Sequence, residues 1–131
     1  MTLRAVIAAT LTAIAVAPAA AAPAAYDIAF VAEFEAACVP QRLSYPGTIE
    51  TAKAEGWRGV ARNVHPELDA LMAKSEEAAN DPELKSTFVY ETLSKSFAGF
   101  DHYLVVSRAT AIIGEEEDPL NPWVTIGCYL Y

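Results

Sequence analysis

The stretch Ser86–Phe97, STFVYETLSKSF, decides the fold, because its side chains alternate with a period of two. One face of an extended chain would carry Phe88 and Tyr90. The opposite face would carry Val89 and Leu93, since successive side chains of a strand point to opposite sides. Alternation of this kind over a run rich in aromatic and β-branched residues predicts a β-strand.

Two further segments after this stretch have strand character. Residues 102–113, HYLVVSRATAII, are rich in β-branched side chains, and residues 123–131 read WVTIGCYLY. The segment AGFD at 98–101 is a turn signal, and GEEEDPLNP at 114–122 is a loop with two prolines. The second half of the chain therefore predicts a three-stranded antiparallel meander.

The segment before the strands has helical spacing. In residues 28–39, IAFVAEFEAACV, the side chains of Phe30, Phe34 and Cys38 recur every four residues and share one helix face. Asp27 would cap the start of this helix, because its carboxylate can accept a bond from an unpaired backbone N–H. Phe34 and Cys38 are therefore expected to face the core.

Two more helices are expected before the first strand. They cover residues 48–55, TIETAKAE, and residues 63–80, NVHPELDALMAKSEEAAN, where Pro66 suits a first helical turn. Helices followed by strands are typical of an α+β fold. We therefore predict N-terminal helices packed on a C-terminal three-stranded antiparallel sheet.

The N-terminus resembles an export signal in its composition. Arg4 precedes an apolar stretch at 5–16 and an alanine-rich region, as in a secretory signal peptide of a bacterial protein. This predicts a signal peptide over 1–21 and a single small domain over 22–131. An uncleaved membrane anchor over 5–25 is the alternative, which the two prolines in that stretch disfavour. The expected location is periplasmic or secreted.

The charge of the chain excludes some partners. The formal net charge is -8, and removal of the signal peptide would take away only Arg4 among the charged residues, which makes it -9. An acidic domain has no electrostatic attraction for phosphate backbones or anionic lipid heads. We therefore expect no nucleic-acid partner, and no membrane contact after signal cleavage.

The two cysteines, Cys38 and Cys128, are 90 residues apart and far from any CxxC or zinc-ligand spacing. An even number of cysteines in an exported chain favours a disulfide. Two buried free thiols are the alternative. In residues 123–131, Cys128 shares a strand face with Ile126, whereas Trp123, Tyr129 and Tyr131 share the other.

No catalytic motif is evident in the sequence, and we expect no cofactor and no metal site. His102 follows Asp101 directly, so the two would point to opposite faces of a strand. The acidic run 115–118, EEED, offers oxygen ligands for calcium but lacks the EF-hand pattern, and indicates a solvated loop.

These observations favour an exported, non-catalytic domain that binds an envelope protein or a small ligand. The alternative is a small hydrolase or metal-dependent enzyme that uses His102 with Asp101 or with the acidic run 115–118.

Overall fold

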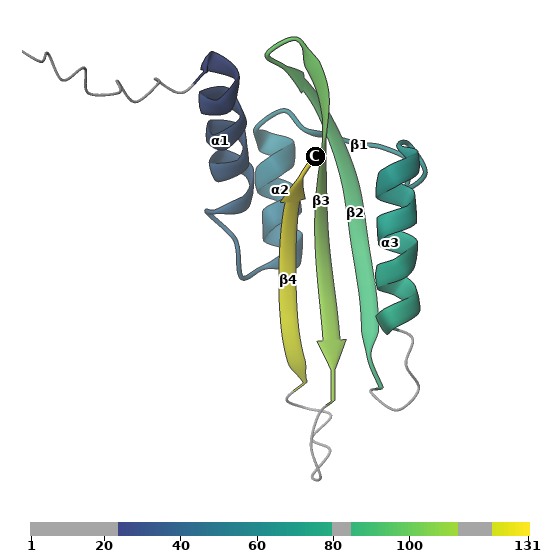
Figure 1. The fold of residues 1–131 in the computed structure, drawn as a ribbon. Helices are drawn as coiled ribbons and strands as arrows, with labels where there is room; N and C mark the ends of the chain where they lie inside the picture. The colour runs from purple at the N-terminus through teal and green to yellow at the C-terminus, as the bar shows by residue number, and fades with distance from the viewer. Residues whose placement is uncertain (1–23, 80–84, 113–121) are drawn as a thin grey trace, which may run out of the picture.

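The computed structural model describes residues 24–79, 85–112 and 122–131. This part of the chain contains three helices and four strands (Figure 1). In chain order they are α1 (Ala25–Cys38), α2 (Tyr45–Ala54), β1 (Arg58–Gly59), α3 (Pro66–Ala79), β2 (Thr87–Phe97), β3 (Phe100–Ala111) and β4 (Trp123–Leu130). The expected signal peptide over 1–21 lies outside the described residues.

The strands form one antiparallel sheet in the order β1-β2-β3-β4. Leu104 in β3 lies opposite Leu93 in β2 on one side and opposite Leu130 in β4 on the other. The α+β class with an antiparallel sheet is therefore confirmed. The expected number of three strands is wrong, because Arg58 and Gly59 pair with β2 and add a fourth.

The position of β1 also corrects the expected order of elements, because it separates α2 from α3, so the helices do not all precede the sheet. Gly56, with a φ of 90°, turns the chain at the end of α2. Trp57 then enters the core and is only 2% exposed. A strand of two residues is too short to show any alternation, which is why no periodic pattern in the sequence indicated it.

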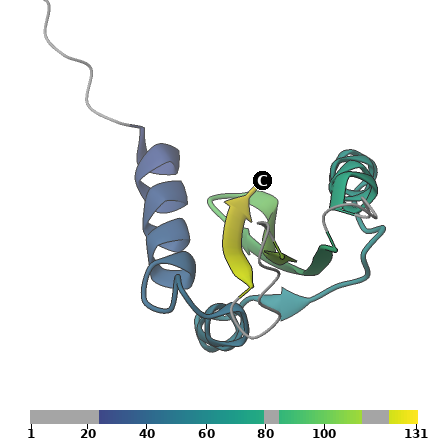
Figure 2. The same ribbon diagram turned by 90° about the horizontal axis from the view of Figure 1, so that it is seen from below.

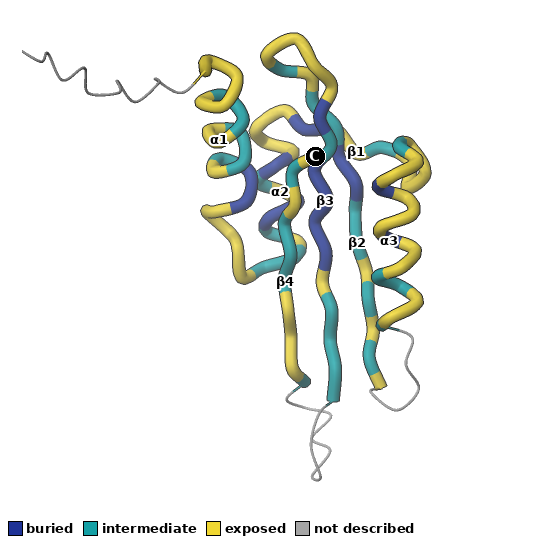
Figure 3. Tube along the Cα trace, in the orientation of Figure 1, coloured by how far each residue is buried: buried dark blue, intermediate teal, exposed yellow. Residues whose placement is uncertain are grey.

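The helices cover both faces of the sheet. Figure 2 shows α1 and α2 on one side of the strands and α3 on the other. The reason lies in β3, where the consecutive residues Leu104, Val105 and Val106 are all fully buried (Figure 3). A strand that is apolar on both faces needs a covering layer on each.

The larger of the two core clusters lies under α1 and α2. Its buried members are Ala37, Cys38, Ile49, Ala52, Trp57, Leu93, Leu104 and Val106. The smaller cluster lies under α3 and consists of Leu68, Met72 and Val105, with Phe88, Tyr90 and Tyr103 packed against it. The expected assignment of Phe88 and Tyr90 to one face of β2 and of Leu93 to the other is confirmed.

The end of α1 is connected to β4. Cys38 and Cys128 form a disulfide, with their Cα atoms 5.9 Å apart, and none of the described cysteines is free. In the middle of α1, Glu33 accepts a hydrogen bond from Lys95 of β2, with a distance of 2.6 Å between Nζ and Oε2. These contacts fix α1 against the sheet at widely separated positions along the chain.

Candidate functional site

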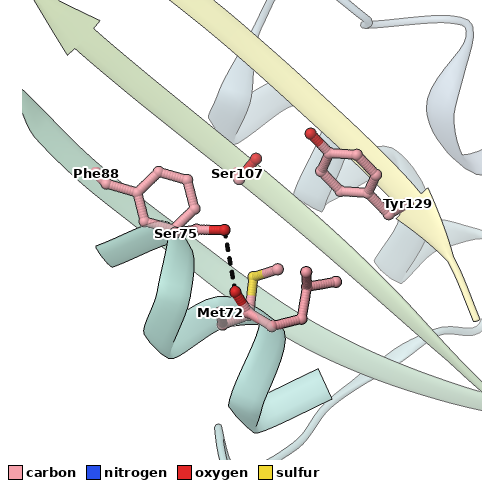
Figure 4. Close-up of a pocket in the computed structure, with 6 residues that line it drawn as sticks. Met72, Ser75, Phe88, Ser107 and Tyr129 are labelled. Atoms are coloured by element: carbon pink, nitrogen blue, oxygen red, sulfur yellow. Dashed lines mark hydrogen bonds between the residues drawn. The ribbon is translucent and has the colours of Figure 1, made fainter. Parts of the chain in front are cut away.

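The face of the sheet that carries α3 is hollowed between α3 and β4. A first cavity of about 150 Å³ is lined by Leu71, Met72, Ser75, Phe88, Ser107 and Tyr129 (Figure 4). A second cavity of about 400 Å³ shares Ser75 and Phe88 with the first and continues along Ala109, Thr125 and Trp123. Because the two cavities share walls, they form one depression, which we call the α3–β4 groove.

The groove exists because α3 covers only part of its face. Figure 2 shows α3 displaced toward one side of the sheet, away from β4. Under the uncovered part, the cross-strand pairs are small residues, Ser107 opposite Gly127 and Ala109 opposite Thr125. Small side chains on the floor leave the space that a fully packed face would fill.

Aromatic side chains of β4 form the wall opposite α3. Trp123 is 68% exposed and Tyr129 is 55% exposed, so both present aromatic surface to the solvent. A Cβ atom on Gly127 would lie 2.7 Å from Cε2 of Tyr129 and 2.6 Å from Oγ of Ser107. The Tyr129 ring therefore lies over Gly127, and only a glycine leaves room for it in this position.

The lining of the groove is apolar with a few hydroxyl groups. No charged residue lines either cavity among the described residues. Ser75 donates a hydrogen bond to the carbonyl of Leu71 at 3.1 Å, which occupies its donor within α3 (Figure 4). The side chain of Ser107 is buried on the floor beside Tyr129. The surface is therefore suited to contact by an apolar group rather than to proton transfer.

A polar cluster lies where β4 ends and α3 begins. The hydroxyl of Tyr131 donates a hydrogen bond to the carboxylate of Glu67. This bond, together with partial desolvation and the negative charge of Glu67, raises the pKa of Tyr131 above its ordinary value of 10.0. The ring of His65 lies 5.0 Å from that of Tyr131 and 5.4 Å from that of Tyr103, measured between centroids.

The structure does not bring Asp101 and His102 together. His102 is buried on the α1 side, where its Nε2 accepts a bond from the Tyr26 hydroxyl at 2.9 Å and its Nδ1 donates to the Phe100 carbonyl at 3.1 Å. The Phe100 carbonyl can only accept, so Nδ1 carries a proton, and in the neutral ring Nε2 is then the acceptor. Asp101 is exposed and accepts a bond from Ser96. Both ring nitrogens of His102 thus have structural partners.

The other candidate residues of the sequence are the acidic run 115–118 and the two cysteines. The acidic run 115–118 is outside the described residues. Cys38 and Cys128 lie on the α1 face of the sheet, opposite the groove. Among the described residues, no group of three His, Cys, Asp or Glu side chains could hold a metal ion.

The sequence did show that Trp123, Tyr129 and Tyr131 share one face of the last strand. It did not reveal the groove, because the position of α3 relative to β4 depends on packing between distant segments.

Comparisons with known proteins found no relative of this chain. No family model, no curated protein and no solved structure matches the chain. None of the helices in the described ranges is both long enough and apolar enough to cross a membrane. The function must therefore be inferred from the α3–β4 groove itself.

Proposed function

We propose that this chain is an exported, non-catalytic binding domain whose α3–β4 groove takes an uncharged, apolar ligand. The observation that carries the proposal is the continuous depression ending at Trp123, which is 68% exposed. The larger cavity, at about 400 Å³, falls within the range of about 300–1,000 Å³ that is usual for small-molecule sites. Export to the periplasm or the medium is supported by the signal-like residues 1–21 and by the disulfide.

The lining determines the chemical class of the ligand. A charged group placed in the groove would lose water without gaining a counter-charge from the described lining residues, which is costly. An aromatic or aliphatic group would instead cover Phe88 and Tyr129 and gain roughly 25 cal/mol for each Å² of apolar surface removed from water. The few hydroxyl groups would orient such a ligand rather than supply most of its affinity.

A fluorescent probe tests this proposal directly. N-phenyl-1-naphthylamine is uncharged and gains fluorescence in apolar surroundings, so it should bind the purified protein saturably. Ala109→Leu should weaken binding about tenfold, a loss of about 1.4 kcal/mol, because the larger side chain fills the floor of the groove. Leu43→Ala is the matched control, since Leu43 is 86% exposed and lines neither cavity of the groove.

Trp123 gives a second, independent signal. The other tryptophan, Trp57, is 2% exposed and should contribute little to quenching by acrylamide, so quenching reports mainly on Trp123. An apolar ligand in the groove should protect Trp123 from the quencher. Binding that is not saturable, or that responds equally to Ala109→Leu and Leu43→Ala, would show that the groove is not the site.

A further inference from the structure

The floor of the α3–β4 groove is a strip of small side chains between β3 and β4. On β3 this strip consists of Ser107, Ala109 and Ala111. Gly127 and Thr125 of β4 lie opposite the first two. Neighbouring strands are about 4.8 Å apart, and the β3 residues of the strip extend over about 14 Å at roughly 3.4 Å per residue. The floor is therefore long and narrow.

The inner end of this floor is closed by α3. Val105, the preceding β3 residue on the same face, is fully buried in a cluster with Met72 of α3, which is 4% exposed. Beyond Val105, Tyr131, which follows β4, donates a hydrogen bond to Glu67 of α3. The outer end is different, because Trp123 there is 68% exposed. A ligand that lies along the floor therefore has its inner limit at Val105 and its other end beside Trp123.

The sides of the inner groove are apolar. Leu71 and Met72 of α3 and Phe88 of β2 line one side, and the ring of Tyr129 of β4 lines the other (Figure 4). A single alkyl chain is about as wide as one strand spacing, roughly 4–5 Å between contacting neighbours. A large saturated ring is wider than the floor, so it cannot contact the small residues along the strip.

We propose that the ligand of the α3–β4 groove carries one unbranched alkyl chain of about 11 carbons, which lies along the floor parallel to β3. An extended chain advances about 1.25 Å per carbon, for C–C bonds of roughly 1.52 Å that meet at about 111°. A floor of about 14 Å therefore holds about 11 carbons. This inference rests on the proposed function and adds the shape of the ligand to it.

The outer end of the groove favours an uncharged head with a hydroxyl group on this chain. Thr125 and Trp123 line the outer cavity, where a hydroxyl group and an indole N–H can form hydrogen bonds with such a head. A carboxylate head is disfavoured, because the chain has a formal net charge of -8 and no cationic residue lines the groove among those described. An ammonium head likewise finds no carboxylate among the described lining residues. The ligand class is therefore a single-chain lipid with an uncharged head.

Linear primary alcohols from hexanol to tetradecanol test this inference, each used below its solubility limit. Their binding is measured directly by the protection of Trp123 from acrylamide, without the naphthylamine probe. Affinity should rise about fourfold with each added carbon, the factor that corresponds to about 0.8 kcal/mol for a buried CH₂ group. The rise should stop at about 11 carbons, because further carbons extend beyond the floor. Cyclododecanol, which has as many carbons as dodecanol, should bind at least about tenfold more weakly.

Ser107→Leu should shorten the floor from its inner end. The larger side chain fills the cavity of about 150 Å³ that Ser107 lines, so about 7 Å of floor is lost. The break in affinity should then move from about 11 to about 6 carbons, while hexanol binds as in the wild type. Ser96→Leu is the matched control and should leave the break unchanged, since Ser96 of β2 is exposed and lines neither cavity of the groove. Circular dichroism checks that both variants are folded.

Several outcomes would overturn the inference. Affinity that rises through tetradecanol without a break would do so, as would cyclododecanol that binds as tightly as dodecanol. A break that Ser107→Leu and Ser96→Leu move equally would have the same meaning. If Ser107→Leu does not fold, the break in the wild type and the comparison with cyclododecanol decide. Decanoate or decylammonium that binds more tightly than decanol would contradict the uncharged head.

Failure of this inference is distinguishable from failure of the proposed function. If the alcohols bind without a break and the naphthylamine probe binds saturably, the groove is an apolar site and only the inference of a linear chain fails. If neither the alcohols nor the probe protects Trp123 from acrylamide, both fail.

Discussion

Removal of the Cys38–Cys128 disulfide should destabilise the domain by an amount that the length of its loop determines. The bond joins residues 90 positions apart, so it restricts most of the domain in the unfolded state. The chain-entropy model gives about 4–5 kcal/mol for a loop of this length. Since about 1 kcal/mol shifts the midpoint of a domain near 100 residues by roughly 4–8 °C, the thermal midpoint should fall by roughly 16–40 °C.

Two perturbations separate the cross-link from packing. Reduction of the wild type with dithiothreitol breaks the bond and keeps both side chains. The double variant Cys38→Ala/Cys128→Ala also removes the buried sulfur of Cys38, whose residue is 3% exposed. The double variant should therefore be less stable than the reduced wild type by about another 1 kcal/mol, the approximate cost of a small cavity in the core.

Urea unfolding followed by tryptophan fluorescence measures both effects, because buried Trp57 becomes exposed on unfolding. A thiol count on denatured, unreduced protein provides the control and should find no free thiol. Oxidised and reduced wild type that differ by less than about 1 kcal/mol would refute the loop argument, because the unfolded state would then gain little freedom from reduction.

Three further substitutions have defined outcomes. Gly127→Ala should cost about 1–3 kcal/mol in urea unfolding and weaken probe binding, because the new Cβ displaces the Tyr129 ring above it and meets the buried Ser107 hydroxyl. Tyr26→Phe should cost about 1–2 kcal/mol by the same assay, since buried His102 loses its hydrogen-bond donor. Glu67→Gln should lower the raised pKa of Tyr131 toward 10.0 in an NMR titration. In the wild type, the contact between Tyr131 and Glu67 stabilises the folded domain at neutral pH, and this stabilisation is lost as the pH rises through the raised pKa. A Tyr131 pKa that is unchanged in the variant would contradict the assignment of Glu67 as the cause of the raised pKa.

Local patterns in the sequence were sufficient to predict most helices and strands of the fold. The alternation in β2 correctly placed Phe88 and Leu93 on opposite faces. Helix starts were less accurate: α2 begins at Tyr45 rather than Thr48. The reason is local chemistry, because the Ser44 hydroxyl accepts a bond from the Gly47 N–H and caps the helix three residues earlier than expected.

The arrangement of the layers could not be derived in the same way. The run Leu104–Val106 marked β3 as a strand, but its burial on both faces was recognised only from the structure. The position of α3 on the far face, and hence the α3–β4 groove, depends on contacts such as Leu68 and Met72 with Val105. Contacts between residues so far apart in sequence leave no periodic signal. The aromatic face of β4 was visible in the sequence, but the space beside it was not.

The two faces of the sheet are covered by clusters of different size, and this difference affects which part of the domain unfolds locally. The core cluster between the α1–α2 layer and the sheet contains eight buried residues, and this layer has a covalent link to β4, whereas the cluster between α3 and the sheet contains three buried residues and no such link. Regions with fewer buried contacts unfold locally at lower free energy than the whole domain. Amide hydrogens of α3 should therefore exchange through a separate, partial opening in which the helix lifts from β2 and β3 while the opposite layer stays closed. In that opened form the floor of the groove would extend to Val105, and under the proposed function it would admit ligands larger than the closed cavity.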